Sequence, residues 1–262
     1  MPRDAWRMKT THAVSAAASS VTVPTTSLRA GGIPEPVRRY VERNVPADQQ
    51  VGSAVHFTQV GEMQLKPGRW LPFRAEQEMA VDRVEFAWRA DFRAALLVSV
   101  RVRDWYRSGV GGLDVRLWGV VPVVRASGEQ FARGEAMRYL AELAWAPQAM
   151  VTNPALEWRV VDESTVEVAT RVARERVAVL LHFDTAGDIV GMSTDARPRM
   201  VGKQVVDTPW SGVFGEYREF NGVRLPTTGE VSWLLSDGPF TYFRGRVTGW
   251  SVDGDAEEGV RR

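Results

Sequence analysis

The chain has 262 residues, with 33 Lys plus Arg against 32 Asp plus Glu and no cysteine. The net charge of +1 argues against nucleic acid as a partner, because no overall field would attract a polyanion. The lack of cysteine excludes disulfides, thiol nucleophiles and thiolate metal sites, and no segment approaches the roughly 18 consecutive apolar residues of a transmembrane segment.

Residues 1–30 are rich in Ser, Thr and Ala and have almost no periodic apolar pattern. Such a segment cannot bury enough surface to offset its ordering entropy, so we expect a disordered tail there and a second one at residues 253–262. The N-terminal Ala/Ser stretch is too polar for a signal peptide, which favours a cytoplasmic location. We expect a single domain over residues 33–252.

A short helix is expected to begin at Ile33, because Pro34 suits a first helical turn. Val37, Tyr40 and Val41 then fall on one face at helical spacing. Asn44 is expected to end this helix.

The pattern changes to a period of two after Val55. Alternation is clearest from Val84 to Phe92, where apolar and polar residues take turns, as in a strand with one buried face. Short turn signals separate many such segments, which favours antiparallel neighbours. The other expected strands are 55–65, 70–79, 98–102, 113–118, 121–126, 156–161, 166–168, 176–183, 188–195, 212–220, 223–234 and 240–252.

One strong helix is predicted in the body of the chain, from Gln130 to Ala146, with Pro147 as its stop. Its apolar stripe, which runs from Met137 to Trp145, has to be buried against the sheet. The expected fold class is mainly β with one central helix, which lies on the concave side of a strongly curved antiparallel sheet.

Motifs for metal or cofactor chemistry are absent. The three histidines, His12, His56 and His182, are scattered, and His182 is read as a satisfied core or edge residue. The sequence has no phosphate-binding loop and no G-x-S-x-G nucleophile elbow. We therefore expect no metal site, no cofactor and no nucleotide site.

Several charged residues are candidates for a polar site. Glu135, Arg138 and Glu142 share one face of the predicted helix and could point a charged triad into a cavity, although a solvated face is the commoner interpretation. Asp104 follows an apolar strand face and precedes Tyr106 on it. It is a candidate acid or base, but a structural pair with an arginine is the commoner role for such a carboxylate.

Tryptophan is abundant, with ten residues in the chain. Most are expected in the core, and two or three are expected to line a cavity, where a large ring offers apolar area and one donor. The last strands carry Phe240, Tyr242, Arg244 and Arg246, for which cross-strand pairing with residues such as Glu230 is the better interpretation.

Six ordered motifs between residues 33 and 252 resemble an uncharacterised bacterial family, a domain of unknown function. They are Ile33-Pro-Glu-Pro-Val-Arg-Arg-Tyr40, Trp70-Leu-Pro-Phe-Arg-Ala-Glu-Gln77, Val102-Arg-Asp-Trp-Tyr106, Arg138-Tyr-Leu-Ala-Glu-Leu-Ala-Trp-Ala-Pro147, Thr208-Pro-Trp-Ser-Gly212 and Gly222-Val-Arg-Leu-Pro-Thr227. The resemblance assigns no catalytic residue. The family's fold is similar to the half-barrel of bacterial lipoprotein carriers, which implies a lipoprotein-carrier-like concavity able to hold acyl chains.

The leading hypothesis is a protein that binds a hydrophobic small molecule or a lipid-like ligand in this concavity. Two alternatives remain open: a small-molecule enzyme with Asp104 or Glu142 as acid or base, and a non-catalytic interaction domain. The candidate ligand-binding residues have three roles. Trp145 would form a wall of the concavity, other aromatic side chains would contact the apolar part of the ligand, and polar side chains would orient its polar headgroup. These candidate residues are Trp88, Asp104, Tyr106, Arg138, Glu142, Trp145, Trp210, Trp233 and Arg244.

Overall fold

Thirteen strands form one antiparallel sheet in this computed structural model, which describes residues 32–95, 98–202 and 204–253. The two expected tails lie outside these residues, except that Asp253 is described and contacts Ser53 and His56. The strands are β1 (Ala54–Lys66), β2 (Arg69–Ala80), β3 (Phe86–Ala95), β4 (Val98–Arg107), β5 (Val110–Leu117), β6 (Val121–Gly128), β7 (Glu157–Val160), β8 (Thr165–Val172), β9 (Glu175–Phe183), β10 (Ile189–Val201), β11 (Gln204–Phe220), β12 (Val223–Leu235) and β13 (Gly238–Val252).

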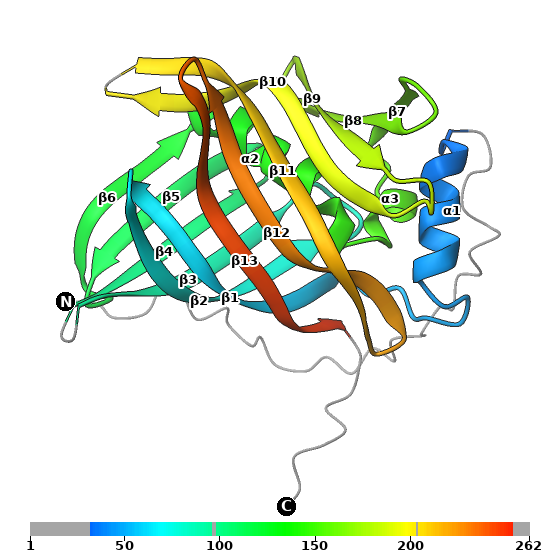
Figure 1. The fold of residues 1–262 in the computed structure, drawn as a ribbon, viewed down its shortest axis with the longest axis horizontal. Coiled ribbons are helices and arrows are strands. Elements are labelled where there is room, and N and C mark those ends of the chain that lie inside the picture. Colours follow the sequence, from blue (N-terminus) through cyan, green and yellow to red (C-terminus); the bar gives the residue numbers. More distant parts are fainter. Residues whose placement is uncertain (1–31, 96–97, 203, 254–262) are drawn as a thin grey trace, which may run out of the picture.

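The sheet is a curved half-barrel whose spatial order is β6-β5-β4-β3-β2-β1-β13-β12-β11-β10-β9-β8-β7 (Figure 1). Neighbouring strands follow the chain in each half, and the two halves join where β1 pairs with β13. The outer edges, β6 and β7, are connected through α2 (Glu129–Ala141), η2 (Glu142–Trp145) and α3 (Ala149–Thr152). Helix α2 lies on the concave side and packs against β5 in one half and against β9 and β10 in the other. The predicted fold class is therefore confirmed.

Alternation in the sequence corresponds to burial in the structure. In β3 the side chains of Phe86, Trp88, Ala90 and Phe92 are buried and belong to one hydrophobic cluster with residues from both halves of the sheet. Arg89, between them, is exposed on the other face. Such a strand buries one row of side chains because successive residues point to opposite faces.

The short N-terminal helix is α1 (Glu35–Asn44), which ends at Asn44 as expected but begins two residues after Ile33, with Pro34 as its N-cap. Val37, Tyr40 and Val41 are buried, and the Tyr40 hydroxyl donates a hydrogen bond to the carbonyl oxygen of Ala144 at 3.3 Å. Helix α1 is thereby attached to the η2 segment at the back of the concavity.

Several boundaries differ from the sequence prediction, among them those of the central helix and of strand β10. The central helix was expected to reach Ala146, but α2 ends at Ala141 and one 3₁₀ turn, η2, follows before Pro147. Strand β10 includes Pro198 and continues to Val201, whereas the expected strand ended at residue 195. Proline is tolerated there because β9 pairs with β10 only from Ile189 to Ser193, so the later part of β10 is an open edge on that side.

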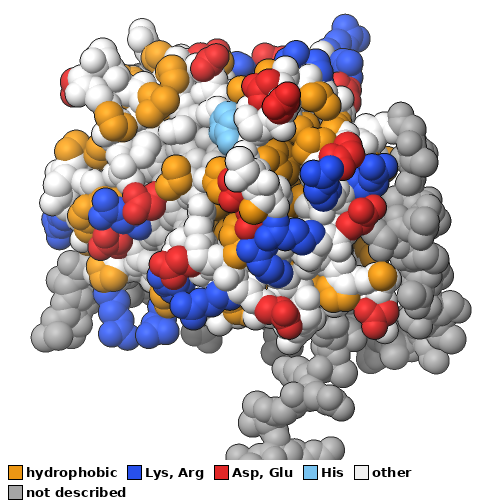
Figure 2. All heavy atoms as spheres, turned by 45° about the vertical axis from the view of Figure 1, so that its right-hand side comes forward, with side chains coloured by type: hydrophobic (Ala, Val, Ile, Leu, Met, Phe, Trp, Pro, Cys, Tyr) orange, Lys and Arg blue, Asp and Glu red, His pale blue; other side chains and the backbone are white. Residues whose placement is uncertain are grey.

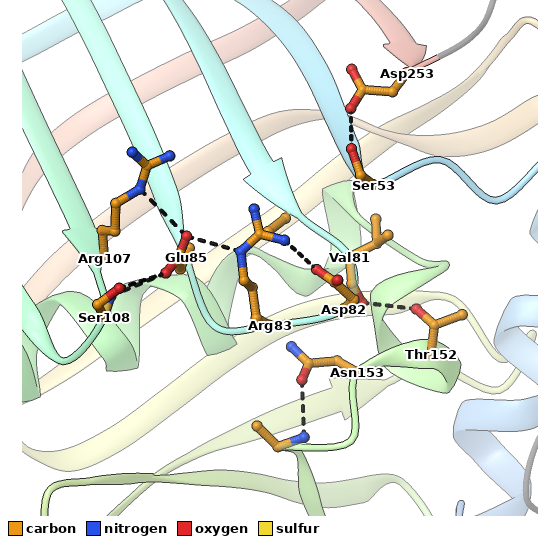
Figure 3. A network of polar contacts seen from close by, with 12 residues as sticks. Ser53, Val81, Asp82, Arg83, Glu85, Arg107, Ser108, Thr152, Asn153 and Asp253 are labelled. Carbon is orange, nitrogen blue, oxygen red and sulfur yellow. Dashed lines mark hydrogen bonds and ion pairs between the residues drawn. The ribbon is translucent and has the colours of Figure 1, made fainter. Parts of the chain in front are cut away.

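A polar network fixes the loop between β2 and β3 (Figure 3). Glu85 accepts a hydrogen bond from Arg83 Nε at 2.9 Å and two from the backbone and hydroxyl of Ser108, at 3.1 and 3.2 Å. Ser108 has a positive φ of 51° in the β4–β5 turn, a conformation that non-glycine residues adopt at some cost. Burial alone would raise the pKa of Glu85, but the Arg83 and Ser108 hydrogen bonds hold this pKa below its usual value.

We expect Glu85→Ala to lower the free energy of unfolding by about 1–2 kcal/mol, because it removes charge-assisted hydrogen bonds that hold the turn. Since the folded-state pKa is depressed, this contribution is present above the ordinary pKa of a glutamate and is lost as the pH falls through the folded value. Urea denaturation at pH 7 and pH 3.5 measures both effects. Glu163→Ala, at an exposed position, is the control, and an equal loss in the two variants would contradict this role of Glu85.

On the face that carries α1, α3 and β7–β9, arginine side chains intermingle with those of Asp and Glu (Figure 2). This mixture agrees with the net charge of +1. Within the described residues, none of the helices combines the length and the apolar character that crossing a membrane requires.

Candidate functional site

A cavity of about 300 Å³ lies between the concave face of the sheet and the α2–η2 segment. Strands from both halves contribute to its wall, which is mostly apolar and aromatic. Its lining residues are Met63, Trp88, Val102, Asp104, Leu113, Val115, Arg138, Ala141, Glu142, Trp145, Met192, Arg197, Trp210, Gly212, Phe214, Gly229, Glu230, Val231, Trp233, Tyr242 and Phe243.

Trp145, the last residue of η2, forms one wall of the cavity and is only 3% exposed. Its ring lies between Phe57 and Phe214, with ring centroids 5.6 and 5.4 Å away. Its indole Nε1 donates a hydrogen bond to the carbonyl oxygen of Pro226 at 2.8 Å. Gly229 allows the close approach, because a Cβ atom there would lie 3.1 Å from the Trp145 ring.

Arg138 of α2 is the centre of a polar cluster in the cavity wall. Its Nη1 donates to Asp104 Oδ2 at 2.5 Å, its Nε to Glu142 Oε1 at 2.8 Å and its Nη2 to Gln77 Oε1 at 3.3 Å. The guanidinium carbon also lies 5.1 Å from the centre of the Trp88 ring. All three nitrogens of this guanidinium are therefore engaged by the protein itself.

The interpretation of Glu135, Arg138 and Glu142 as a solvated helix face is wrong for Arg138 and Glu142. Their side chains are only 15% and 14% exposed, because this face of α2 points toward β2 and β4 and not toward water. Asp104 takes the structural role, as the partner of an arginine. Burial alone would lower the pKa of Arg138, but the charges of Glu142 and Asp104 hold this pKa above its usual value.

Glu135, one turn before Arg138, forms a carboxyl pair with Asp104. Burial and the negative charge of Asp104 raise the pKa of Glu135 to about 8. Glu135 Oε2 and Asp104 Oδ1 are both buried without a donor from any described residue. Two ionised carboxylates offer only acceptors, so a proton on Glu135 provides the donor that both oxygens lack. Glu135 is thus a neutral acid near pH 7.

Arg197 of β10 is the second cationic group in the cavity wall. It is 8% exposed, and its guanidinium carbon lies 4.3 Å from the centre of the Trp210 ring. Its Nε donates to the carbonyl oxygen of Gly134 at 3.2 Å, and its Nη1 donates to the Tyr242 hydroxyl at 3.3 Å. These contacts come from β11, α2 and β13, so the guanidinium plane is fixed from three directions.

Seven of the nine candidate site residues line this one cavity, although they come from strands and helices far apart in sequence. These seven are Trp88, Asp104, Arg138, Glu142, Trp145, Trp210 and Trp233. Tyr106 is buried but does not line the cavity. Arg244 also lies outside the lining and is half-exposed, with Glu62 and Glu230 each at 3.5 Å. This is the cross-strand pairing expected for Arg244.

Sequence reasoning missed Arg197, and the structure gives the reason. The pairing of β10 with β11 shifts register between Thr194 and Arg197, so simple alternation fails at this position. Arg197 also lies beyond the expected strand, which ended at residue 195. The local sequence signal that could have pointed to Arg197 is an arginine directly before a proline in a segment with β-strand character.

Metal-binding side chains do not gather in the part of the chain that the structure describes, where no group of three or more could hold an ion. His56 contacts Asp253 at 2.6 Å, and His182 shares a hydrogen bond with the Ser193 hydroxyl at 2.8 Å. Burial lowers the pKa of His182. The described histidines thus both have side-chain partners, Asp253 directly after β13 and Ser193 on β10.

Fold and cavity together define a β half-barrel with an apolar, ligand-sized interior. The chain belongs to the Family of unknown function (DUF6544), whose profile matches residues 23–245, and this confirms the resemblance to an uncharacterised family. No curated protein sequence matches the chain. Among solved structures it is similar to a LolA superfamily protein from Nitrosomonas europaea, at 8% identity and a TM-score of 0.45, over 85% of this chain and 94% of the other.

Proposed function

We propose that this protein binds a hydrophobic small molecule or lipid-like ligand in the cavity between the sheet and α2. The observation that carries the proposal is a cavity of about 300 Å³ with four tryptophans in its wall. This volume lies at the lower end of the range typical of small-molecule sites, which are mostly apolar with a few placed polar groups. Arg138 and Arg197 are the cationic groups here.

The test is to fill the cavity and measure binding of a neutral apolar fluorophore, N-phenyl-1-naphthylamine. Val231 lines the cavity, whereas Val213, on the adjacent strand, is 59% exposed. We expect the wild type and Val213→Trp to bind the probe with similar affinity and Val231→Trp to bind it at least 10-fold more weakly, because the added ring occupies the space.

Native mass spectrometry of protein purified without detergent complements the titration, since a co-purifying molecule gives the ligand mass directly. If the probe does not bind the wild type, or binds Val231→Trp and Val213→Trp equally, the proposed site is wrong. A circular dichroism melt of each variant separates loss of the cavity from loss of the fold.

The enzyme alternative finds less support in the geometry. Asp104 and Glu142 both form ion pairs with Arg138, and a paired carboxylate is a poor general base. Turnover that is lost on Asp104→Asn with the fold intact would favour that alternative.

The interaction-domain alternative has one observation in its favour. Val120, Val121 and Val123, at and near the β5–β6 turn, are exposed. An interaction domain would, however, have a filled interior, and the cavity weighs against it.

A further inference from the structure

We infer that the ligand carries an anionic headgroup, a carboxylate or a phosphate, and that Arg197 receives it. This inference rests on the proposed function and names the chemical class of ligand. It depends on the difference between the two arginines in the cavity wall: one is neutralised by the protein, and the other is not.

Each of the three guanidinium nitrogens of Arg138 already has a partner in the protein. Its three nitrogens donate to Asp104, Glu142 and Gln77, and two of these partners are carboxylates. An anion placed beside Arg138 would meet these two negative charges at close range. The polar cluster therefore disfavours a headgroup at this position.

Arg197, in contrast, has no carboxylate within ion-pair distance among the described residues. Its two hydrogen-bond partners, the Gly134 carbonyl and the Tyr242 hydroxyl, are both uncharged. Glu135, whose charge state is sensitive to Arg197, is neutral near pH 7 for the reasons given above. The positive charge of a 92% buried side chain is thus left without a direct counter-ion.

A buried cation without a partner is costly, because the protein interior solvates it poorly. Chains retain such costly groups where function requires them. Arg197 Nη2 donates to no described residue and, unlike Arg199 Nε, is not among the sealed atoms without a partner. It is therefore a donor that is not fully buried, on a residue that lines the cavity.

The surroundings of Arg197 fit an amphiphile. A guanidinium offers parallel donors that match a carboxylate or phosphate, and stacking on Trp210 fixes its plane. Trp233 and Phe243, which also line the cavity, provide apolar contacts for the chain of such a ligand. The chemistry is that of an alkyl carboxylate or an alkyl phosphate.

The experiment compares decanoate, decyl phosphate and decan-1-ol as displacers of N-phenyl-1-naphthylamine at pH 7.5. We expect the wild type to prefer at least one anion over the alcohol by roughly 10- to 100-fold, as one charge-assisted interaction implies. Arg197→Met should reduce this preference, taken as the ratio of anion to alcohol affinity within the variant, to less than about 3-fold. Arg244→Met, which removes an arginine outside the cavity, should keep the preference.

Stability gives a second readout. Without ligand, Arg197→Met should melt at or above the wild-type temperature, because the variant buries no unpaired charge. Decanoate should then raise the melting temperature of the wild type more than that of the variant. If Arg197→Met does not fold, Arg197→Lys, which keeps the charge, should retain the preference for the anion.

The possible results separate the two proposals. If the wild type binds the probe and the probe is displaced equally well by decanoate, decyl phosphate and decan-1-ol, the anionic headgroup is wrong. The proposed hydrophobic site is then still supported. A preference that survives in Arg197→Met overturns the role of this residue. If neither the probe nor any of the three amphiphiles binds the wild type, the proposed function fails and this inference fails with it. A preference for only one of the two anions identifies the headgroup.

Discussion

Replacing Arg138 by methionine should lower the free energy of unfolding by about 3–5 kcal/mol. The variant leaves the carboxylates of Asp104 and Glu142 in the cavity wall without their common partner, and both side chains are at most 15% exposed. The cost therefore arises from uncompensated buried charge more than from lost packing, since methionine fills much of the same volume. Urea denaturation at pH 7 measures it.

The matched control is Arg244→Met, because Arg244 also contacts two carboxylates, but at 3.5 Å and with a half-exposed side chain. Exposed ion pairs contribute about 0–1 kcal/mol, so this variant should be close to the wild type. Adding Asp104→Asn and Glu142→Gln to Arg138→Met should recover part of the lost stability. If the two single variants cost the same, or the added substitutions recover nothing, the charge cluster does not stabilise the fold in this way.

The second large effect is a change in the pH dependence of the free energy of unfolding when Glu135 is replaced by glutamine. A glutamate whose folded-state pKa is raised to about 8 destabilises the fold progressively as the pH rises from its ordinary value of 4.5 to 8. The groups that set this pKa are Asp104 of β4, Arg197 of β10 and Arg138 of α2, together with burial. Glutamine stays neutral and donates to Asp104 at every pH.

We therefore expect Glu135→Gln to match the wild type near pH 4.5 and to exceed it by about 2–4 kcal/mol at pH 8.5. This range lies below the full conversion of the pKa difference, because part of the Glu135 side chain reaches solvent. Denaturation curves at half-unit pH steps measure the divergence. Curves that stay parallel from pH 4.5 to 8.5 would show that Glu135 is ionised in the fold and would remove the argument for a shared proton.

Local sequence patterns predicted the elements well because they depend on short-range alternation. Phe86 to Phe92 could be assigned to a half-buried strand from spacing alone, and the buried face proved correct. The polar face of α2 could not be assigned in this way. Helical spacing shows that Arg138 and Glu142 share a side, but only the tertiary fold shows that Asp104 and Gln77 lie opposite them.

The aromatic character of the cavity could be predicted from the sequence, but not all of the residues that line it. The tryptophans could be identified as candidates because large rings suit the wall of a cavity. Arg138 could be identified because its i, i+4 spacing to Glu142 predicts an ion pair. Arg197 was not, because a register shift in β10 decides which way its side chain points. The pairing of β1 with β13 likewise has no local signal.

That pairing has a consequence for how the chain folds. His56 and Asp253 are in contact although they lie 197 positions apart, and β1 meets β13 along its length from Val55 to Met63. During synthesis, β1 to β6 emerge long before β13, so β1 has an unpaired edge for most of that time. Contacts between such distant segments pay a large loop-closure entropy and form slowly. A nascent chain of this protein is therefore most exposed to edge-to-edge aggregation just before its final strand, Gly238–Val252, leaves the ribosome.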